Sequence, residues 1–373
     1  MIKINNEHCI GCGICMLSCL HDAISLVEIK SGEYGPVIDV NKCIGCNKCE
    51  EGCNVFNKAE PVHTVMNTFF GYSSRQEKRR ESSSGGIFIE LASDFIRKYG
   101  CVAGAAFNKN GFVEHVLVDN VDDLSRLQGS KYCESKVWTV FREIERRLKA
   151  GEWILFSGVP CEVFSLKAFL KKDYSKLICC EVFCHGAPRV GVYRKYKELM
   201  ERKYGKIINF NFRSKAEGWG KPNYKINFKN KTIVQSHSKN IYHLMFGTHH
   251  SLRRSCLKCN FRSIRRNADI SLGDFWGIEK YYPKENMKDG VSAVLVSTEK
   301  GKKLVDECKN IILKKCQVEE ITDKNKWLIE CFEKPAGYEK FNHDFISMNT
   351  RLLFLKYKFK YFVLDRIKRK LRC

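Results

Sequence analysis

Hydrophobic and polar residues alternate with two distinct periods along the chain, and these periods predict short strands and one-sided helices over most of its length. Alternation with period two at 101–107 and 113–118 predicts two antiparallel strands around a turn at 108–111. Apolar residues spaced three and four apart predict helices at 88–99 and 137–150, each with one buried face.

The middle of the chain has a repeated strand–turn–helix order. A strand at 153–156 is expected before a helix at 162–170, and a strand at 177–183 before a helix at 190–204. Units of this kind build an α/β sheet, and ligands of such sheets bind at the edge where the strands end.

The other patterns complete the expected fold. They predict strands at 23–29, 36–40, 207–213, 224–228, 232–235, 291–297 and 312–318, and helices at 241–246, 298–310 and 325–331. The loop at 214–222 holds Trp219 and two glycines and is expected to be mobile. We predict an α+β protein with a first domain at 1–60, a linker at 61–81, a mixed α/β domain at 82–345 and a tail at 346–373.

Composition places the chain among globular proteins of a reducing compartment. Of its 373 residues, 44% are hydrophobic and 12% aromatic, and no run of ~18 apolar residues predicts a membrane span. No signal-peptide pattern opens the chain, and its 20 cysteines are therefore expected to stay reduced in the cytoplasm.

The net charge of +23 is unevenly distributed. Residues 1–60 hold five lysines against eight acidic residues, a balance of −3, so the remainder carries +26. A basic surface attracts acidic redox partners, phosphate-bearing cofactors or anionic lipid. No motif for DNA or RNA recognition occurs, so no nucleic acid partner is expected.

Two cysteine runs with the same spacing, C-x2-C-x2-C-x3-C, dominate the first domain. This spacing supplies three thiolates to one [4Fe–4S] cluster and sends the fourth to a second cluster. One predicted ligand set is Cys9, Cys12, Cys15 and Cys53, and the other is Cys43, Cys46, Cys49 and Cys19. Zinc knuckles or disulfides are the alternatives, but zinc has no need of the repeated fourth cysteine.

This stretch resembles the bacterial-type two-cluster ferredoxins over about residues 1–60. Runs of that type usually continue with proline after the fourth cysteine, whereas Leu20 and Asn54 follow here. All eight ligands are present, so the departure concerns the local turn and the reduction potential.

A small, polar segment precedes the helix predicted at 88–99. It reads Ser82-Ser83-Ser84-Gly85-Gly86, and a helix N-terminus with exposed amides binds anions such as a phosphate of a dinucleotide. The alternative is a helix cap followed by a flexible glycine pair.

Four further cysteines have positions suited to ligands. Cys161 and Cys184 follow predicted strands, and Cys256 and Cys259 form a C-x2-C pair. Together they suit a four-thiolate site, with zinc or two separate pairs as alternatives. Asp274 also follows a predicted strand, where a carboxylate contacts a ribose or flavin edge, or caps a turn.

The tail interleaves aromatic and basic residues. From Arg351 to Cys373 it holds nine lysines and arginines against one acid. We expect a terminal helix docked by its apolar face, with peripheral contact to the inner face of a membrane as the alternative.

Several motifs together resemble the β-subunit of coenzyme F420 hydrogenase/dehydrogenase, over roughly 68–345. The motifs are Ser83-Ser84-Gly85-Gly86, Gly129-Ser130-Lys131-Tyr132, Gly158-Val159-Pro160-Cys161, Cys184-His185-Gly186, Cys256-x2-Cys259, and Asp269-Ile270 with Gly273-Asp274-Phe275-Trp276-Gly277. In that family the Ser-Gly-Gly segment lies against FAD, and cysteines of the catalytic domain hold a further [4Fe–4S] cluster.

The resemblance implies site residues in this chain. FAD would lie against Ser83, Ser84, Gly85, Gly86, Ser130 and Asp274, and the third cluster would be held by Cys161, Cys184, Cys256 and Cys259, with Cys133 in reserve. Lys131 would neutralise the pyrimidine edge of the flavin or a phosphate, and His185 would supply a proton.

The implied function is that of an iron–sulfur flavoprotein oxidoreductase. Electrons would pass between a ferredoxin-type or other low-potential partner and a small-molecule acceptor. The acceptor would be the deazaflavin coenzyme or another small molecule, including one of surface-polysaccharide metabolism, because relatives fused to a ferredoxin resemble proteins of such gene sets. The alternative is an electron-transfer adaptor that serves a partner enzyme and binds no substrate.

Overall fold

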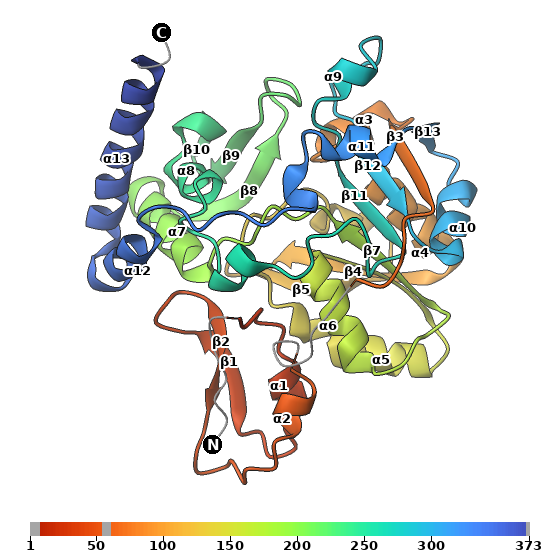
Figure 1. Cartoon of the computed structure of the whole chain (residues 1–373), viewed down its shortest axis with the longest axis horizontal. Coiled ribbons are helices and arrows are strands. Elements are labelled where there is room, and N and C mark those ends of the chain that lie inside the picture. The colour runs from red at the N-terminus through yellow and green to blue at the C-terminus, as the bar shows by residue number, and fades with distance from the viewer. Residues whose placement is uncertain (1–7, 54–60, 371–373) are drawn as a thin grey trace.

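A computed structural model of the chain describes residues 8–53 and 61–370, with side chains placed as far as Phe362. The described residues form an N-terminal module, a large sheet covered by helices, and a small sheet beside two C-terminal helices (Figure 1). In Figure 1 the N-terminal module projects below the rest of the molecule. The predicted α+β architecture is confirmed.

The N-terminal module is built from the two cysteine runs and a hairpin. Its elements are α1 (Ile14–Leu17), β1 (Ile24–Glu28), β2 (Tyr34–Ile38) and α2 (Lys48–Glu51), with β1 and β2 antiparallel. Each run forms a short helix, and Gly13 and Asn47, at the same place in the two runs, both have left-handed backbones before these helices. The sequence repeat is therefore also a structural repeat.

Eight strands of the described residues form the main sheet. They are β3 (Asn67–Ser73), β4 (Gly100–Phe107), β5 (Val113–Val118), β6 (Trp153–Gly158), β7 (Leu177–Val182), β11 (Ile270–Asp274), β12 (Ser292–Val296) and β13 (Ile311–Lys315), in the order β13-β3-β12-β11-β7-β6-β4-β5. The central strands β4, β6, β7 and β11 run parallel, and the flanking strands pair antiparallel.

Helices cover both faces of this sheet. They are α3 (Gln76–Glu81), α4 (Ile87–Lys98), α5 (Phe141–Lys149), α6 (Pro160–Leu170), α9 (Ile278–Tyr281), α10 (Glu299–Glu307) and α11 (Val318–Thr322), with 3-10 turns η1 (Asp122–Arg126), η2 (Val137–Val140), η4 (Arg254–Lys258) and η5 (Lys326–Leu328). Leu155 packs into the core that includes α4, whereas Ile154 and Phe156 pack into the core that includes α5 and α6. Burial on both faces explains the apolar runs at 153–156 in β6 and 177–180 in β7.

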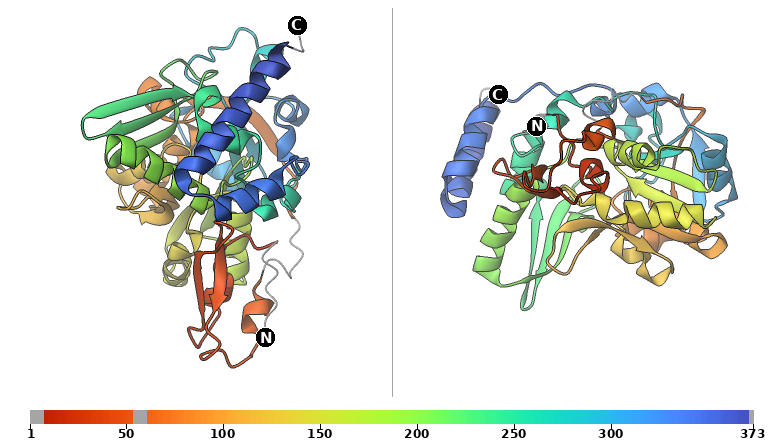
Figure 2. Two further views of the ribbon diagram at one scale, coloured as in Figure 1. Left: turned by 90° about the vertical axis from the view of Figure 1, so that its left-hand side faces the viewer. Right: turned by 90° about the horizontal axis from the view of Figure 1, so that it is seen from below.

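The small sheet consists of β8 (Ile207–Ser214), β9 (Asn223–Phe228) and β10 (Lys231–Ser236). Around it lie α7 (Val190–Tyr204), η3 (His237–Lys239), α8 (Ile241–Gly247), α12 (Tyr338–Ser347) and α13 (Thr350–Lys370). Helix α13 buries Leu353, Phe354, Tyr357 and Tyr361, which confirms the expected docked tail helix. Figures 1 and 2 show α13 at one side of the molecule, where it contacts α7 and α8. Among the described residues, no helix combines the length and apolar content that crossing a membrane requires.

Two expected elements differ from the structure. The interval 61–81 was expected as a linker, but it contains β3, which lies inside the main sheet, and α3. The charged run at 75–80 holds a buried residue, because the Arg79 guanidinium lies 3.7 Å from the Tyr72 ring centroid and its Nε donates to the Gly290 carbonyl. The helix expected at 325–331 is only the short turn η5, since Asn325 donates through its side chain to two backbone carbonyls.

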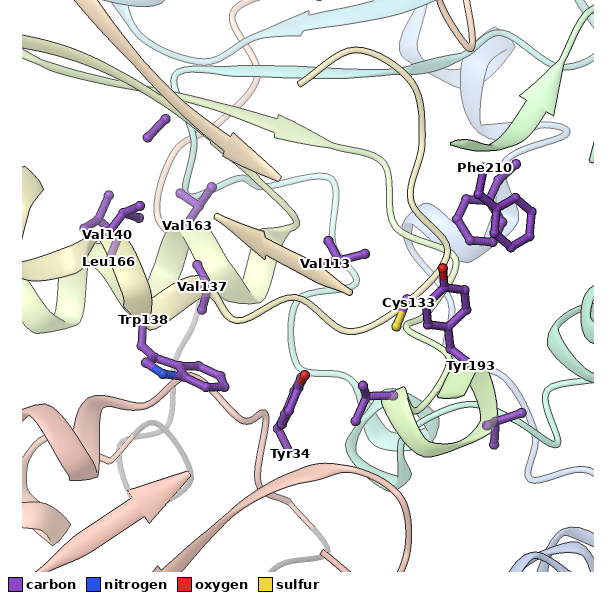
Figure 3. Packing of buried hydrophobic residues seen from close by; sticks show 14 of the residues in the cluster. Tyr34, Val113, Cys133, Val137, Trp138, Val140, Val163, Leu166, Tyr193 and Phe210 are labelled. Atoms are coloured by element: carbon purple, nitrogen blue, oxygen red, sulfur yellow. The ribbon is translucent and has the colours of Figure 1, made fainter. Parts of the chain in front are cut away.

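The N-terminal module is fixed to the larger part by buried contacts. Tyr34 meets Trp138 edge-on, with ring centroids 5.4 Å apart (Figure 3). The Gly191 amide donates to the Gly32 carbonyl over 2.8 Å, and Glu28 accepts two hydrogen bonds from Arg194. The position of the module therefore depends on close packing as well as on the chain connection.

Gly13 lies at the tightest point of this contact, so we predict that Gly13→Asn loosens the docked module. A Cβ at Gly13 would lie 2.5 Å from the Trp138 Cβ. Asn47 adopts the same left-handed backbone at the equivalent position, so the cost arises from the Trp138 contact and not from the backbone. Hydrogen exchange read by mass spectrometry should accelerate at the Gly191 amide. Asn47→Gly is the matched control, and equal exchange in both variants would contradict the interpretation.

Candidate functional site

A cavity of about 610 Å³ opens at the edge where the central parallel strands end. Its wall includes Gly158 from β6, Val182 from β7 and Asp274 from β11, together with the start of α4. This is the edge at which α/β sheets bind ligands, and the volume lies in the range of cofactor sites. The sequence-based prediction of the edge therefore agrees with the cavity.

The Ser83 hydroxyl joins two of the predicted flavin segments. Its Oγ accepts hydrogen bonds from the Ser130 amide over 2.8 Å and from the Ser130 hydroxyl over 3.0 Å. Both residues line the cavity. The segments at 83–86 and 129–132, separated in the sequence by the β4–β5 hairpin, thus form one continuous wall.

The two glycines of the Ser-Gly-Gly segment have different roles. A Cβ at Gly85 would lie 2.5 Å from the Gly71 carbonyl, so Gly85 permits close packing against β3. Gly86 is left-handed and precedes α4, whose first residues line the cavity. The start of a helix, whose first amides have no partner within the helix, is suited to an anion. Ser84 and Gly85 bond with the sheet, so the segment is both a helix start and part of the cavity wall.

Lys215, from the loop after β8, holds this segment in place. Its Nζ donates to the carbonyls of Arg79, Ser84 and Asp289 over 2.8, 2.5 and 2.6 Å. Burial lowers the pKa of Lys215 to about 7, and Asp274 opposes this effect. Sequence reasoning missed Lys215, because its partners are backbone carbonyls from two distant segments.

The four cysteines predicted for the third cluster lie together in the cavity wall. Cys161 is in the first turn of α6, Cys184 follows β7, Cys256 lies in η4, and Cys259 follows it. Burial, together with the smaller effect of neighbouring thiols of the same set, raises the pKa of Cys184 to about 12 and that of Cys256 to about 11. The Ala187 amide points at the Cys256 sulfur, 3.4 Å away. A cationic centre would favour the thiolates that burial disfavours.

Two other cysteines were expected in different roles. Cys133, the reserve ligand, lines the cavity but packs in the core with Tyr34 and Tyr193 (Figure 3). Cys331 was not predicted at the site, yet its thiol donates to the Cys259 carbonyl over 3.4 Å. Cys331 is therefore the neighbouring thiol that any test of the ligand set must include.

The eight cysteines of the N-terminal module separate into the two crossed sets that the spacing predicts. Cys53 lies close enough to Cys9, Cys12 and Cys15 to raise their pKa, after the larger effect of burial. Cys19 lines a separate small hollow with Cys43, Cys46 and Cys49. The fourth cysteine of each run therefore lies with the first three of the other run, as cluster binding requires.

Among the described residues, no three His, Cys, Asp or Glu side chains form a group suited to one metal ion. A mononuclear zinc site holds its sulfurs only ~3.8 Å apart, given Zn–S bonds of ~2.3 Å. A four-iron cluster places its ligands on separate corners and so requires a wider cage.

Lys131 and His185, the two predicted catalytic residues, both line the cavity. Lys131 Nζ donates to the carbonyls of Arg126 and Gln128, and burial lowers its pKa to about 7. His185 Nε2 lies 3.0 Å from His249 Nε2, and burial lowers the pKa of His185 to about 3. His185 is therefore neutral at pH 7.

The Asp274 carboxylate is occupied by protein groups. It accepts from Arg213 over 2.6 Å and from the Trp219 indole over 2.7 Å, and Trp219 stacks on Trp276 with ring centroids 4.6 Å apart. The loop expected to be mobile thus buries its Trp219 side chain. Asp274 orients Arg213, which also lines the cavity and was missed in the sequence.

A second wall of the cavity comes from the small sheet and α8. His237 and His243 stack with ring centroids 3.8 Å apart, and Tyr132 lies within 6.4 Å of both rings. Burial lowers the pKa of His237 to about 4 and of His243 to about 2, so both are neutral imidazoles at pH 7. This wall offers aromatic surface and neutral hydrogen-bonding groups to a ligand.

Comparisons with known proteins found similarity for the N-terminal module and for part of the larger domain. Residues 151–324 match the family model for the C terminus of the coenzyme F420 hydrogenase/dehydrogenase beta subunit, and residues 8–57 match that of the 4Fe-4S dicluster domain. No curated protein sequence matches the chain. A chain in the xenon-derivatised F420-reducing [NiFe] hydrogenase complex from Methanosarcina barkeri is similar with a TM-score of 0.48 and 15% identity, over 72% of this chain and 91% of that chain. Residues 8–57 are thus similar to a 4Fe-4S dicluster domain, and residues 151–324 are similar to the C terminus of the coenzyme F420 hydrogenase/dehydrogenase beta subunit.

Proposed function

We propose that the protein is an iron–sulfur flavoprotein oxidoreductase that connects a one-electron carrier with a two-electron substrate. The observation that carries this proposal is the spatial arrangement of three sets of cysteine thiols, which lead from the N-terminal module to the cavity. One set lines a hollow of the N-terminal module, a second lies beside the larger domain, and a third lines the cavity that also holds Ser83 and Gly86. When bound, [4Fe–4S] clusters exchange single electrons and FAD exchanges two.

The cavity wall fits a flavin dinucleotide. The start of α4 and the Ser83–Ser130 contact would bind the pyrophosphate, and Lys215 fixes the Ser84 carbonyl behind them. Arg213 is held by Asp274 at the same cavity. Lys131 would face the pyrimidine edge of the flavin or a phosphate, as the resemblance implies.

The substrate would lie against the wall formed by Tyr132, His237 and His243. We propose a small molecule such as the deazaflavin coenzyme or an intermediate of surface-polysaccharide metabolism. His185 supplies a hydrogen-bonding N–H as a neutral imidazole, since its pKa is far below 7. His185 would therefore act on the substrate by hydrogen bonding, because loss of its N–H proton would leave an imidazolate and His249 is also neutral at pH 7.

The alternative function is a non-catalytic adaptor that passes electrons to a partner enzyme. The wall of Tyr132, His237 and His243 favours the enzyme, because an adaptor needs no surface for a substrate. Flavin reduction followed by turnover of a soluble acceptor would support the enzyme. Flavin reduction with no turnover until a partner protein is added would support the adaptor.

Cofactor content is the direct test of the proposal. Protein purified without oxygen should contain about twelve irons, about twelve acid-labile sulfides and about one FAD per chain. About eight irons and no flavin would overturn the catalytic proposal and leave a ferredoxin-like module joined to a binding domain.

The third thiol set predicts a specific loss of iron. Cys184→Ser should lower the iron content by about four per chain and leave the two clusters of the N-terminal module in place. Cys331→Ser is the matched control, because Cys331 contacts the Cys259 backbone from the exposed surface. If Cys331→Ser lost four irons and Cys184→Ser did not, the ligand assignment would be wrong.

The outer hollow of the module carries an apolar rim. Leu20, Val40 and Ile44 are 73, 63 and 67% exposed; Ile44 lines the hollow, Leu20 directly follows Cys19, and Val40 lies in the segment that leads to Cys43. Exposed apolar side chains near a redox centre suit transient docking of a carrier protein. We propose this rim as the contact for the one-electron partner.

Changing the rim should slow electron entry without altering the cofactors. Val40→Lys should lower the rate of reduction by a reduced two-[4Fe–4S] ferredoxin about tenfold, the effect of ~1.4 kcal/mol at an interface. Reduction by dithionite should be unaffected. Leu355→Lys, at a residue of α13 that is 61% exposed, is the control. An equal effect of both variants would contradict docking at the rim.

A further inference from the structure

The Arg253 guanidinium lies between two of the thiol sets. Its Nη2 donates to the Cys9 carbonyl over 2.8 Å, which ties it to the first run. Arg253 also precedes η4, which carries Cys256. Burial lowers the pKa of Arg253, but Glu134, Cys256 and Cys9 together raise it above the ordinary value. One buried positive charge therefore acts on thiols of both sets.

Glu134 pairs with Arg253; burial raises the pKa of Glu134 to about 7, and the charge of Arg253 opposes this rise and favours the carboxylate. The Arg253 Nε lies 2.9 Å from a Glu134 oxygen, and the two side chains are 9% and 1% exposed. The other Glu134 oxygen accepts from the Val190 amide over 2.8 Å and from the Tyr34 amide over 3.4 Å. With little water to screen it, the pair produces a stronger field than a surface ion pair would.

Other contacts place the same two sets side by side. A Cβ at Gly11 would lie 2.9 Å from Arg253 Nη2, so the first run is packed directly against the guanidinium. Ser165 interacts with the Cys12 thiol and also donates to the Cys161 carbonyl over 2.7 Å. Cys12 itself lines the cavity together with Cys161.

The remaining set has a different environment. The hollow of Cys19, Cys43, Cys46 and Cys49 is lined by residues of the N-terminal module alone. Gly45, the counterpart of Gly11 in the second run, has nothing within 4 Å of an added Cβ. The two runs are thus equal in spacing but unequal in what they contact.

We propose that the buried Arg253–Glu134 pair couples the cluster of Cys9, Cys12, Cys15 and Cys53 to the cluster of Cys161, Cys184, Cys256 and Cys259, and sets their reduction potentials. This inference rests on the proposed function. One electron leaves the first cluster as one enters the other, so the first is oxidised and the second reduced, and no atom is transferred. Arg253 and Glu134 contact each other and the backbone of the N-terminal module, and we assign them a positioning role.

The sign of each residue's effect follows from charge. Reduction adds one negative charge to a cluster, which a neighbouring cation stabilises and a neighbouring anion destabilises. Arg253 therefore raises the potentials of the two clusters, and Glu134 lowers them. In the unaltered protein the opposite effects of the two charges on the potentials partly cancel. Removing one charge therefore leaves the effect of the other on the potentials uncompensated.

Midpoint potentials measured by redox titration with electron paramagnetic resonance test this inference in the full-length holoprotein. Arg253→Gln should lower the potentials of the two coupled clusters, and Glu134→Gln should raise them. The double variant should return close to the original values, and Arg253→Lys should restore most of the Arg253→Gln shift. The cluster of Cys43, Cys46 and Cys49 with Cys19 is the internal control and should not move in any variant.

A purely structural role for the pair would give a different result. Both single variants would then shift the potentials in the same direction, or leave them unchanged, and either result would overturn the inference. Glu134→Gln keeps the shape of the side chain and remains informative if Arg253→Gln does not fold. If the holoprotein contains about twelve irons and the potentials do not change, the coupling is wrong but the proposed function stands. If the protein lacks the third cluster, both the coupling and the proposed function are wrong.

Discussion

The molecule depends on the arrangement of its central parallel strands, which all end at one edge of the main sheet. Parallel strands require their connections to cross the sheet, so segments far apart in the chain reach the same edge. That geometry brings Cys161, Cys184 and Asp274 to one cavity although more than a hundred residues separate the first from the last. The N-terminal module packs beside the same edge, so its inner thiol set lies next to the thiols of the cavity.

Much of this could be predicted from the sequence, because the relevant signals are local or repeated. The spacing of the cysteine runs predicted which thiols come together, including the crossed positions of Cys19 and Cys53. Cys161 and Cys184, which follow predicted strands, predicted that a ligand site lies at the edge of the sheet where these strands end. Helix periodicity predicted α4, α7 and the docked tail helix α13 within a few residues.

The features that sequence analysis did not predict depend on contacts between distant segments of the chain. Lys215 donates to backbone carbonyls of two segments, and Arg253 and Glu134 come from distant segments of the larger domain and meet beside the N-terminal module, so no sequence motif marks them. The strand β3 lies between a cysteine-rich module and a charged run, and its place in the sheet is decided by pairing with β12 and β13. The burial of Arg79 could not be predicted from the charged run at 75–80, because it results from packing of the guanidinium on the Tyr72 ring.

The unequal surroundings of the two cysteine runs have an evolutionary consequence. Gly11 and Gly13 touch the larger domain, so almost any change there disturbs the fit of the two parts. Gly45 and the exposed rim around it touch no other part of the described chain closely, so this run can vary while its cysteines are kept. A lineage could therefore exchange one electron carrier for another by altering the outer run, without any change to the chemistry at the cavity.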